Sequence, residues 1–389
     1  MGLMILQNAV GGDVFVDGGV IAAGGTVGGE VVNCSGLNLF PGFIDVHNHG
    51  AVGVDVNEAD ADGLIEIGTY LAAQGVTAWV PTLVPDSDEN YSRVIAAIDW
   101  LMEVQSELPI AQIVGVHYEG VFANEKMCGA LRPEYFKSFR VNSRDLVVKD
   151  QTKNIPDDLS FIFGLPTLMI GVHMTTFAPE IEGGVDLARE LTRHGWIASI
   201  GHTRADVETL DRTFAAGAKH VTHFFNAMTG IHHRDVGVAG WALTNDEVTF
   251  DIIADGIHVN PNMLEFACRR KSPERTLLIS DSVAPTGLGD GSFSLWGETI
   301  TVENGRTKNE RGSIAGSVIS MLDAVKMMLS LSFTPDEVSK MASANPARLL
   351  GLEDSRGSLA TGKRADIVGI DADGDVKLVM IAGEIVVRK

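Results

Sequence analysis

Cysteine is scarce in this chain of 389 residues, and the little that is present forms no recognisable pattern. The three cysteines, Cys34, Cys128 and Cys268, are odd in number and show no Cys-x-x-Cys spacing. This usage excludes a zinc ribbon and a disulfide framework, because both need paired cysteines at characteristic spacings. We therefore expect a protein of the reducing cytoplasm.

Positive charge is also in short supply. The 30 basic residues stand against 51 acidic ones, which gives a formal net charge of -21. A field of this sign repels nucleic-acid backbones and anionic lipid surfaces over long range, so we expect neither nucleic acid nor a membrane as a partner. A small phosphorylated ligand stays open, because a local arginine or histidine can outweigh a distant, screened field.

Long apolar runs and an early basic segment are absent as well. No run approaches the ~18 apolar residues of a membrane span, and the first basic residue is Arg93. We expect no signal peptide, transit peptide or membrane anchor. We find no internal repeat and no low-complexity tract. A hydrophobic content of 45% over this length is ample for one large domain and a smaller one.

The two ends of the chain are predicted to form one small β-domain. Residues 1–40 are rich in Gly and Val and contain short alternating stretches, and the tail has strand-like runs at 365–371 and 376–381. Because the ends of a domain are often close in space, we expect residues 1–40 and 351–389 to pair, with residues 41–350 as the larger domain.

Between these ends, strand-like and helix-like stretches alternate. The strand-like runs end near eight positions: Val46, Val80, Val116, Ile170, Ile200, Thr222, Ile253 and Ser280. Amphipathic helical stretches are predicted at residues 60–74, 89–103, 184–194, 205–216, 261–270, 318–331 and 335–343. Eight β/α units within about 240 residues predict an α/β protein built on a (β/α)8 TIM barrel. The polar, irregular run 124–166 is predicted to form a lid or substrate loop.

Several predicted strands end in side chains that bind metals. His47 and His49 are two residues apart, so they lie on the same side of an extended strand. Glu119, His202 and His223 follow three further strands. Since the carboxyl ends of barrel strands meet at one face, these residues are predicted to hold divalent metal. Such ligands suit zinc, iron or manganese, and they leave open whether one or two ions bind.

Asp281 follows the eighth strand and is predicted to be the catalytic acid and base. Residues 281–287 bring no second nitrogen ligand, and a carboxylate beside a metal site is well suited to proton transfer. We expect Asp281 to take a proton from the attacking water and to return it to the departing nitrogen. The alternative is that Asp281 only caps the segment after its strand. Together these residues predict a metal-dependent hydrolase.

Four other histidines are given lesser roles. His117 points to the same side of its strand as Glu119 and could be a ligand, but a packing or supporting role is favoured. His173 and His220 are interpreted as core or supporting residues. His194 is interpreted as a positive charge at the end of a helix.

Two further segments are candidates for binding substrate. His258 follows the seventh strand, where loops of the active face of a barrel are built. His232-His233-Arg234 follows the sixth strand and is the only concentrated positive charge near the predicted site. An anion site needs such charge, although a solvated loop is the alternative.

Six stretches spread over almost the whole chain share a family pattern. They are PGFIDVHNHG (41–50), APE (178–180), GHT (201–203), THFFNAM (222–228), IADGIHV (253–259) and GS (316–317). On these stretches the chain resembles the N-acetylglucosamine-6-phosphate deacetylases of the amidohydrolase superfamily. The first and last stretches are shared widely across that superfamily, whereas residues 223–228 and 253–259 are specific to the deacetylase group.

The resemblance implies roles for the metal-binding residues. Glu119, His202 and His223 would bind the metal common to all members, with Asp281 as the acid and base. The His-x-His pair of binuclear members implies a second ion, held by His47 and His49 and bridged by Glu119.

The resemblance also implies how substrate is bound. The protein would be a homodimer in which Arg234 reaches the sugar phosphate in the neighbouring subunit's site. His258 would contact the substrate, and Asn226 and Ala227 would contact the phosphate. Ala130, in the segment 128–131, would also bind substrate.

Two departures from the family pattern bear on the substrate. Members usually have His-x-Glu-Gly-Pro-Phe and then Lys-Gly-Ala-His, whereas this chain has Val121 in place of the proline and ends the second motif with Leu131. Leu131 replaces a histidine that would contact substrate, and leaving its partner group unpaired costs about 1–3 kcal/mol.

The predicted function is deacetylation of an N-acetylhexosamine 6-phosphate, with N-acetylglucosamine 6-phosphate as the first expectation. Because of Leu131, N-acetylgalactosamine 6-phosphate is an alternative, as is a different N-acyl or cyclic amide. A non-catalytic scaffold of the same fold is disfavoured, because such proteins typically lose ligands that this chain keeps.

Overall fold

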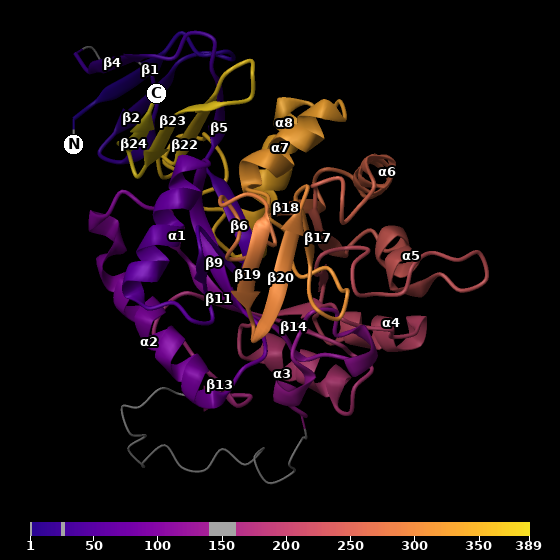
Figure 1. Ribbon diagram of the computed structural model, residues 1–389. Coiled ribbons are helices and arrows are strands. Elements are labelled where there is room, and N and C mark those ends of the chain that lie inside the picture. The colour runs from indigo at the N-terminus through magenta and orange to yellow at the C-terminus, as the bar shows by residue number, and fades with distance from the viewer. Residues whose placement is uncertain (1, 25–27, 140–160) are drawn as a thin grey trace.

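A closed barrel of parallel strands forms the centre of the computed structural model, which describes residues 2–24, 28–139 and 161–389 (Figure 1). The strands follow one another around the ring in chain order. They are β6 (Phe43–Asn48), β9 (Val76–Leu83), β11 (Gly115–Phe122), β14 (Val172–Phe177), β15 (Ile197–Ile200), β16 (His220–Val221), β17 (Thr249–Ile253) and β18 (Thr276–Ile279). The ring closes where the backbone N–H of Asp281 donates to the carbonyl of His47 at 3.0 Å. The predicted TIM barrel is confirmed.

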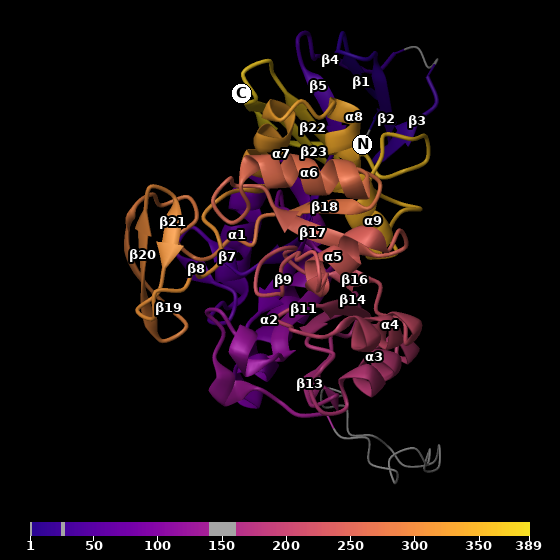
Figure 2. The ribbon, with the colours of Figure 1, turned by 90° about the vertical axis from the view of Figure 1, so that its right-hand side faces the viewer.

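Helices cover the outside of this barrel (Figures 1 and 2). They are α1 (Ala61–Ala73), α2 (Asp88–Val104), α3 (Gly184–Arg193), α4 (Val207–Ala215), α5 (Gly237–Thr244), α6 (Pro261–Lys271), α7 (Met321–Ser330), α8 (Pro335–Ser339) and α9 (Asn345–Leu349). Several begin at a polar cap: Asp60, Ser87 and Asp206 each accept a hydrogen bond from a backbone N–H of the first turn. Sequence periodicity missed α5, because seven of its eight residues are buried and no polar face marks it as a helix.

The fourth barrel strand lies later in the chain than predicted. The sequence indicated a strand ending near Ile170, but Met169 and Ile170 are 79% and 60% exposed, and β14 begins at Val172. β14 contains polar residues, so the sequence shows no continuous apolar run at this strand. The hydroxyl of buried Thr176 lies 2.8 Å from Nε2 of His117 and 2.7 Å from the hydroxyl of Thr222, so these polar groups satisfy one another inside the barrel.

The chain ends lie together beside the barrel as two four-stranded sheets (Figures 1 and 2). One contains β1 (Met4–Gln7), β2 (Val14–Asp17), β3 (Val20–Ala22) and β4 (Glu30–Asn33), and the other contains β5 (Asn38–Pro41), β22 (Ile367–Ile370), β23 (Val376–Ile381) and β24 (Glu384–Arg388). Leu6, Val32, Ile367 and Met380 belong to one buried cluster that joins the two sheets. The predicted small β-domain of the two terminal segments is therefore present.

Arg356 connects this β-domain to the barrel. Its guanidinium group donates to Asp366, next to β22, and to the side chain of Gln112 at 3.0 Å. Gln112 begins the short strand β10 (Gln112–Ile113), which pairs with β9 of the barrel. Burial makes a pair of this kind sensitive to loss of either partner.

A three-stranded antiparallel sheet follows β18 and was not predicted. It contains β19 (Gly291–Leu295), β20 (Glu298–Glu303) and β21 (Arg306–Lys308), and Figure 2 shows it at one side of the barrel. Leu295 and Trp296 belong to a buried cluster with Ala123 and Leu131. This sheet therefore covers the segment that follows β11.

The remaining short elements lie mostly in loops. They are β7 (Gly50–Ala51), β8 (Val54–Asp55), β12 (Phe161–Ile162), β13 (Leu165–Pro166), η1 (Gln105–Glu107), η2 (Glu125–Met127), η3 (Pro133–Tyr135) and a π-helical turn, η4 (Lys340–Ala344). Of the predicted lid, residues 140–160 lie outside the described residues. Within the described ranges, no helix combines the length and apolar character needed to cross a membrane.

Candidate metal centre and active site

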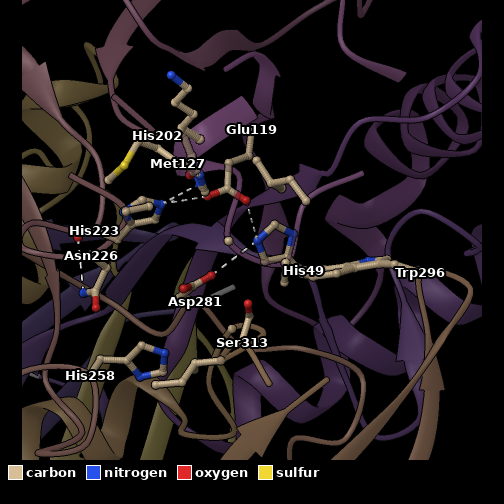
Figure 3. A pocket seen from close by; sticks show the side chains of 17 residues that line it. His49, Glu119, Met127, His202, His223, Asn226, His258, Asp281, Trp296 and Ser313 are labelled. Atoms are coloured by element: carbon tan, nitrogen blue, oxygen red, sulfur yellow. Dashed lines mark hydrogen bonds and ion pairs between the residues drawn. The ribbon is translucent and has the colours of Figure 1, made fainter. Parts of the chain in front are cut away.

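Three of the predicted metal ligands meet at the carboxyl ends of the barrel strands (Figure 3). Glu119 lies within β11, while His202 and His223 follow β15 and β16. The Nε2 atoms of the two histidines lie 3.0 Å apart, and they are 3.2 and 3.0 Å from Oε1 of Glu119. All three side chains are buried, so a cation between them would be shielded from solvent.

The other predicted residues form a second group beside the first. The Nε2 atoms of His47 and His49 are 3.0 Å apart, and each lies 3.3 Å from Oδ1 of Asp281. The second oxygen of Glu119 is 3.2 Å from His49, so this carboxylate lies between the two groups. The six side chains come from five different strands or their ends, and they form two adjoining groups of three.

Backbone carbonyls orient two of the histidines. Nδ1 of His202 donates to the carbonyl of Met127 at 2.8 Å, and Nδ1 of His49 donates to the carbonyl of Thr82 at 3.2 Å. A proton on Nδ1 leaves the lone pair on Nε2, which faces the centre of the cluster. This is the arrangement that a metal-binding histidine requires, and the donor set of imidazoles and carboxylates fits a zinc, iron or manganese ion.

The electrostatics of the cluster favour a bound cation. Burial alone would raise the pKa of Glu119, but His47, His202 and His223 hold that pKa well below its usual range. Burial opposes a charge on His49, yet hydrogen bonds with Asp281 and Glu119 raise the pKa of His49 to about 10, so a cation that binds here replaces a proton on Nε2. Ionised carboxylates packed against imidazoles therefore create a centre that attracts positive charge.

Three residues of the cluster have a left-handed backbone. The φ angles of His202, His223 and Asp281 are +47°, +34° and +50°, and each residue is the second after the end of a barrel strand. Such a conformation costs a residue other than glycine on the order of 1–3 kcal/mol and persists only where surrounding contacts hold it. The inward direction of these side chains therefore lowers the stability of the fold.

A cavity of about 400 Å³ opens over the cluster and is large enough for a small phosphorylated sugar. Four of the residues predicted to bind substrate line it: Ala130, Asn226, Ala227 and His258. Arg234 does not line it; this side chain is exposed, and its Nη1 donates to Nε2 of His233 at 2.8 Å. The structure thus separates Arg234 from the cavity of its own chain.

Other residues that line the cavity escaped the sequence reasoning, chiefly Lys126, Met127, Trp296, Ser313 and Ile314. Lys126 belongs to η2, and Trp296 lies between β19 and β20 with its ring 5.3 Å from that of His49. Lys126 and Met127 directly precede the segment 128–131, and Ile314 lies just before the family stretch 316–317, but none of the five positions belongs to a motif. The one available signal was the long segment after the third strand, which was predicted to reach substrate.

Leu131 is 2% exposed and lines the cavity with one face. A Cβ atom added at Gly120 would lie 2.1 Å from Cδ1 of Leu131, so Leu131 occupies space that only a glycine leaves free. This packing presents hydrocarbon to the cavity where a histidine would present a ring nitrogen.

The remaining histidines make hydrogen bonds with their neighbours. His117 contacts Thr176 as described above, and Nε2 of His220 lies 2.9 Å from Oδ2 of Asp251. Nε2 of His173 accepts from the backbone N–H of Leu168 at 2.8 Å. His194 is the C-terminal cap of α3.

The barrel, the small β-domain and the cluster of imidazoles and carboxylates define a hydrolase of the amidohydrolase type. Residues 38–386 match the model of the Amidohydrolase family, and the chain belongs to that family.

Two curated relatives carry deacetylase names. The chain is 32% identical over 369 residues to N-acetylgalactosamine-6-phosphate deacetylase of Escherichia coli O157:H7, covering 94% of this chain and 92% of the relative. It is 34% identical over 351 residues to N-acetylglucosamine-6-phosphate deacetylase of Bacillus subtilis, covering 89% and 84%.

Two solved structures that resemble this chain also carry deacetylase names. N-acetylglucosamine-6-phosphate deacetylase from Thermotoga maritima has a TM-score of 0.80 with 30% identity, covering 100% of this chain and 99% of its own. A D267A mutant of the Mycobacterium smegmatis enzyme, in complex with N-acetyl-D-glucosamine-6-phosphate, has a TM-score of 0.84 with 30% identity and covers 99% of both chains.

Proposed function

We propose that this protein removes the acetyl group from an N-acetylhexosamine 6-phosphate, releasing acetate and the amino sugar phosphate. The observation that carries the proposal is the cluster of imidazoles and carboxylates at the floor of a cavity of about 400 Å³. The names of the curated relatives and the sugar phosphate bound by the Mycobacterium smegmatis enzyme support the substrate class.

The metal site is assigned to five side chains. Glu119, His202 and His223 would hold one ion, and His47 and His49 would hold a second with Glu119 between the two. When bound, a divalent ion in such a site acidifies water and polarises the carbonyl of the scissile amide. The ligands suit zinc, iron or manganese, and metal analysis of the purified protein decides among these ions.

Asp281 is assigned the proton transfers. Its carboxylate lines the cavity next to His47 and His49, and these histidines lower the pKa of Asp281 although burial opposes this. The ionised group accepts a proton from the attacking water. The protonated group then donates that proton to the nitrogen of the amide as the carbon–nitrogen bond breaks.

The phosphate of the substrate is assigned to Asn226 and Ala227, with Arg234 of the partner subunit completing the site in a homodimer, and His258 is assigned another contact with the bound substrate. Arg234 is exposed and is not among the residues that line the cavity of its own chain, which supports a role across a subunit interface. The three free cysteines support a cytoplasmic location for the enzyme.

Arg234→Ala is expected to raise KM for the phosphorylated substrate by about 10–100-fold, because a hydrogen bond to a charged group contributes about 1.5–3 kcal/mol. Steady-state acetate release measures the effect. The matched control is the unphosphorylated N-acetylhexosamine, on which the variant and the wild type should perform alike. An equal loss on both substrates would remove Arg234 from the phosphate site.

Mixed subunits test whether Arg234 acts across the interface. Arg234→Ala and Asp281→Asn chains should each be impaired alone, but a heterodimer would contain one site with both residues intact. Activity recovered on mixing therefore supports the shared site, and no recovery despite exchange of subunits contradicts it.

A second candidate substrate, N-acetylgalactosamine 6-phosphate, is favoured by Leu131. A leucine offers no hydrogen bond to a sugar hydroxyl where related deacetylases have a histidine. Leu131→His is expected to raise the ratio of kcat/KM for N-acetylglucosamine 6-phosphate over its galactosamine epimer by about 5–10-fold, the worth of one neutral hydrogen bond. Paired acetate-release assays measure that ratio, and Leu131→Met is the control that keeps an apolar side chain. An unchanged ratio in Leu131→His would show that Leu131 does not choose the epimer.

The proposed function itself is tested by profiling acetate release on both 6-phosphate epimers, on their unphosphorylated forms and on N-acyl amino acids, with metal content measured on the same sample. Preference for a phosphorylated N-acetylhexosamine is the expected result. Hydrolysis of only the unphosphorylated or non-sugar amides would overturn the proposal.

A further inference from the structure

Glu180 belongs to the family stretch APE (178–180) but takes no part in the proposed metal site, substrate site or proton transfers. It follows β14 and is half-buried. Its carboxylate accepts hydrogen bonds from the Asn124 side chain at 2.7 Å, from the backbone N–H of Arg204 at 2.6 Å and from the hydroxyl of Thr203. A single carboxylate thus joins the segment after β11 to the segment after β15.

These two segments also meet at the metal cluster. Met127 lies three residues after Asn124, and its carbonyl accepts the Nδ1 proton of His202, as Figure 3 shows beside the cavity. The backbone N–H of Asn124 donates to the carbonyl of His202 at 3.1 Å. Glu180 therefore holds residues on both sides of the contact that orients His202.

The backbone of His202 needs such support. Its φ angle is +47°, a left-handed conformation that a β-carbon disfavours. Glu180 accepts from the side chain and the backbone of the two residues that directly follow His202, which fixes the direction in which the chain leaves this strained position. The charge on the carboxylate strengthens these hydrogen bonds.

We propose that Glu180 is a positioning residue for the reaction: it holds His202 and the cavity-lining segment 124–131 together, so that Nε2 of His202 and the residues around Lys126 and Ala130 keep their places. The proposal rests on the proposed role of His202 as a metal ligand. Glu180 touches neither the substrate cavity nor the metal cluster, and it acts through Asn124, Thr203 and Arg204.

The other two strained residues of the cluster are held in the same way. Oδ1 of Asp251, in β17, accepts from the backbone N–H of His223. Asp45, in β6, accepts from the backbone N–H of Ser280 at 3.2 Å, one residue before Asp281. In each case a carboxylate from the neighbouring strand bonds to the backbone at or beside a left-handed residue. Glu180 is the least buried of the three, so its substitution is the least damaging to folding.

A double-mutant cycle tests the proposal. Glu180→Ala is expected to lower kcat/KM and the affinity for metal by about tenfold or more, as is usual when a residue that orients a ligand is removed. Asn124→Ala should cause part of the same loss, and the double variant should lose less than the product of the two single effects. Glu180→Gln, which keeps one acceptor oxygen, should recover much of the activity.

Controls separate positioning from general damage. Glu265→Ala removes an exposed carboxylate of α6 and should change neither kcat/KM nor metal affinity, the latter measured by competition with a chelator. Thermal unfolding of every variant shows whether the fold is intact. Multiplicative effects of Glu180→Ala and Asn124→Ala, or a Glu180→Ala variant within twofold of wild type, would overturn the role of Glu180. A His202→Ala variant that keeps its metal and activity would instead overturn the proposed metal site.

Discussion

Asp281→Asn is expected to lower kcat for acetate release by about 100- to 10,000-fold while leaving the metal content nearly unchanged. The side-chain amide is close to the carboxylate in size, so the cluster around His47 and His49 should keep its geometry. The amide of the asparagine, unlike the carboxylate, cannot take up a proton from the attacking water at neutral pH. The same sample should therefore be assayed for acetate release and for metal by elemental analysis.

A matched control shows that the loss reflects the position of the carboxylate. Asp246→Asn makes the same chemical change at a highly exposed site, where Asp246 lies 3.9 Å from Arg270, and it should leave kcat intact. An Asp281→Asn variant with wild-type turnover would remove Asp281 from the proton transfers. A variant without metal would show that Asp281 is chiefly a ligand.

Glu119→Gln is expected to lose metal and activity together. The carboxylate lies between the two groups of ligands, 3.0 Å from His223 on one side and 3.2 Å from His49 on the other. An amide carries no charge to balance a divalent ion. Removal of a residue that only supports a ligand lowers metal affinity by about 10–100-fold, and the loss in Glu119→Gln should be larger. Metal content after dialysis and acetate release with and without added metal measure both effects.

The dependence of Glu119→Gln activity on metal concentration shows whether Glu119 acts as a metal ligand. Partial recovery of Glu119→Gln activity at high metal concentration would agree with lost affinity. Full metal content together with full activity would contradict the role of Glu119, because the carboxylate would then be dispensable to the cluster. Thermal unfolding in the presence of a chelator shows how much stability the bound metal adds.

The alternation of strands and helices predicted the barrel because most of its strands are apolar and are followed by a surface helix with one buried face. Where that physical signal fails, the prediction fails too. Helix α5 is buried on nearly all sides, and β14 carries buried threonines instead of an apolar run. The strands β19, β20 and β21 were missed, although exposed and buried residues alternate along β20 and β21, a pattern typical of strands with one covered face.

The convergence of these imidazoles and carboxylates was predictable because barrel strands deliver their ends to one face, which turns distances along the sequence into proximity in space. Residues that reach the cavity from long connections were not predictable in this way. Trp296 and Ser313 arrive from the segment between β18 and α7, and their contact with the cavity depends on how that segment folds back. The link from Glu180 to Asn124 likewise depends on two loops meeting.

The most direct measurement is anomalous X-ray diffraction at the absorption edge of the metal found in the purified protein. We expect an anomalous peak about 2.0–2.2 Å from Nε2 of His202, Nε2 of His223 and an oxygen of Glu119, with Asp281 beside it. A peak near His47 and His49 would add the second ion. Active crystals with stoichiometric metal bound elsewhere, and no peak among these side chains, would contradict the proposed chemistry.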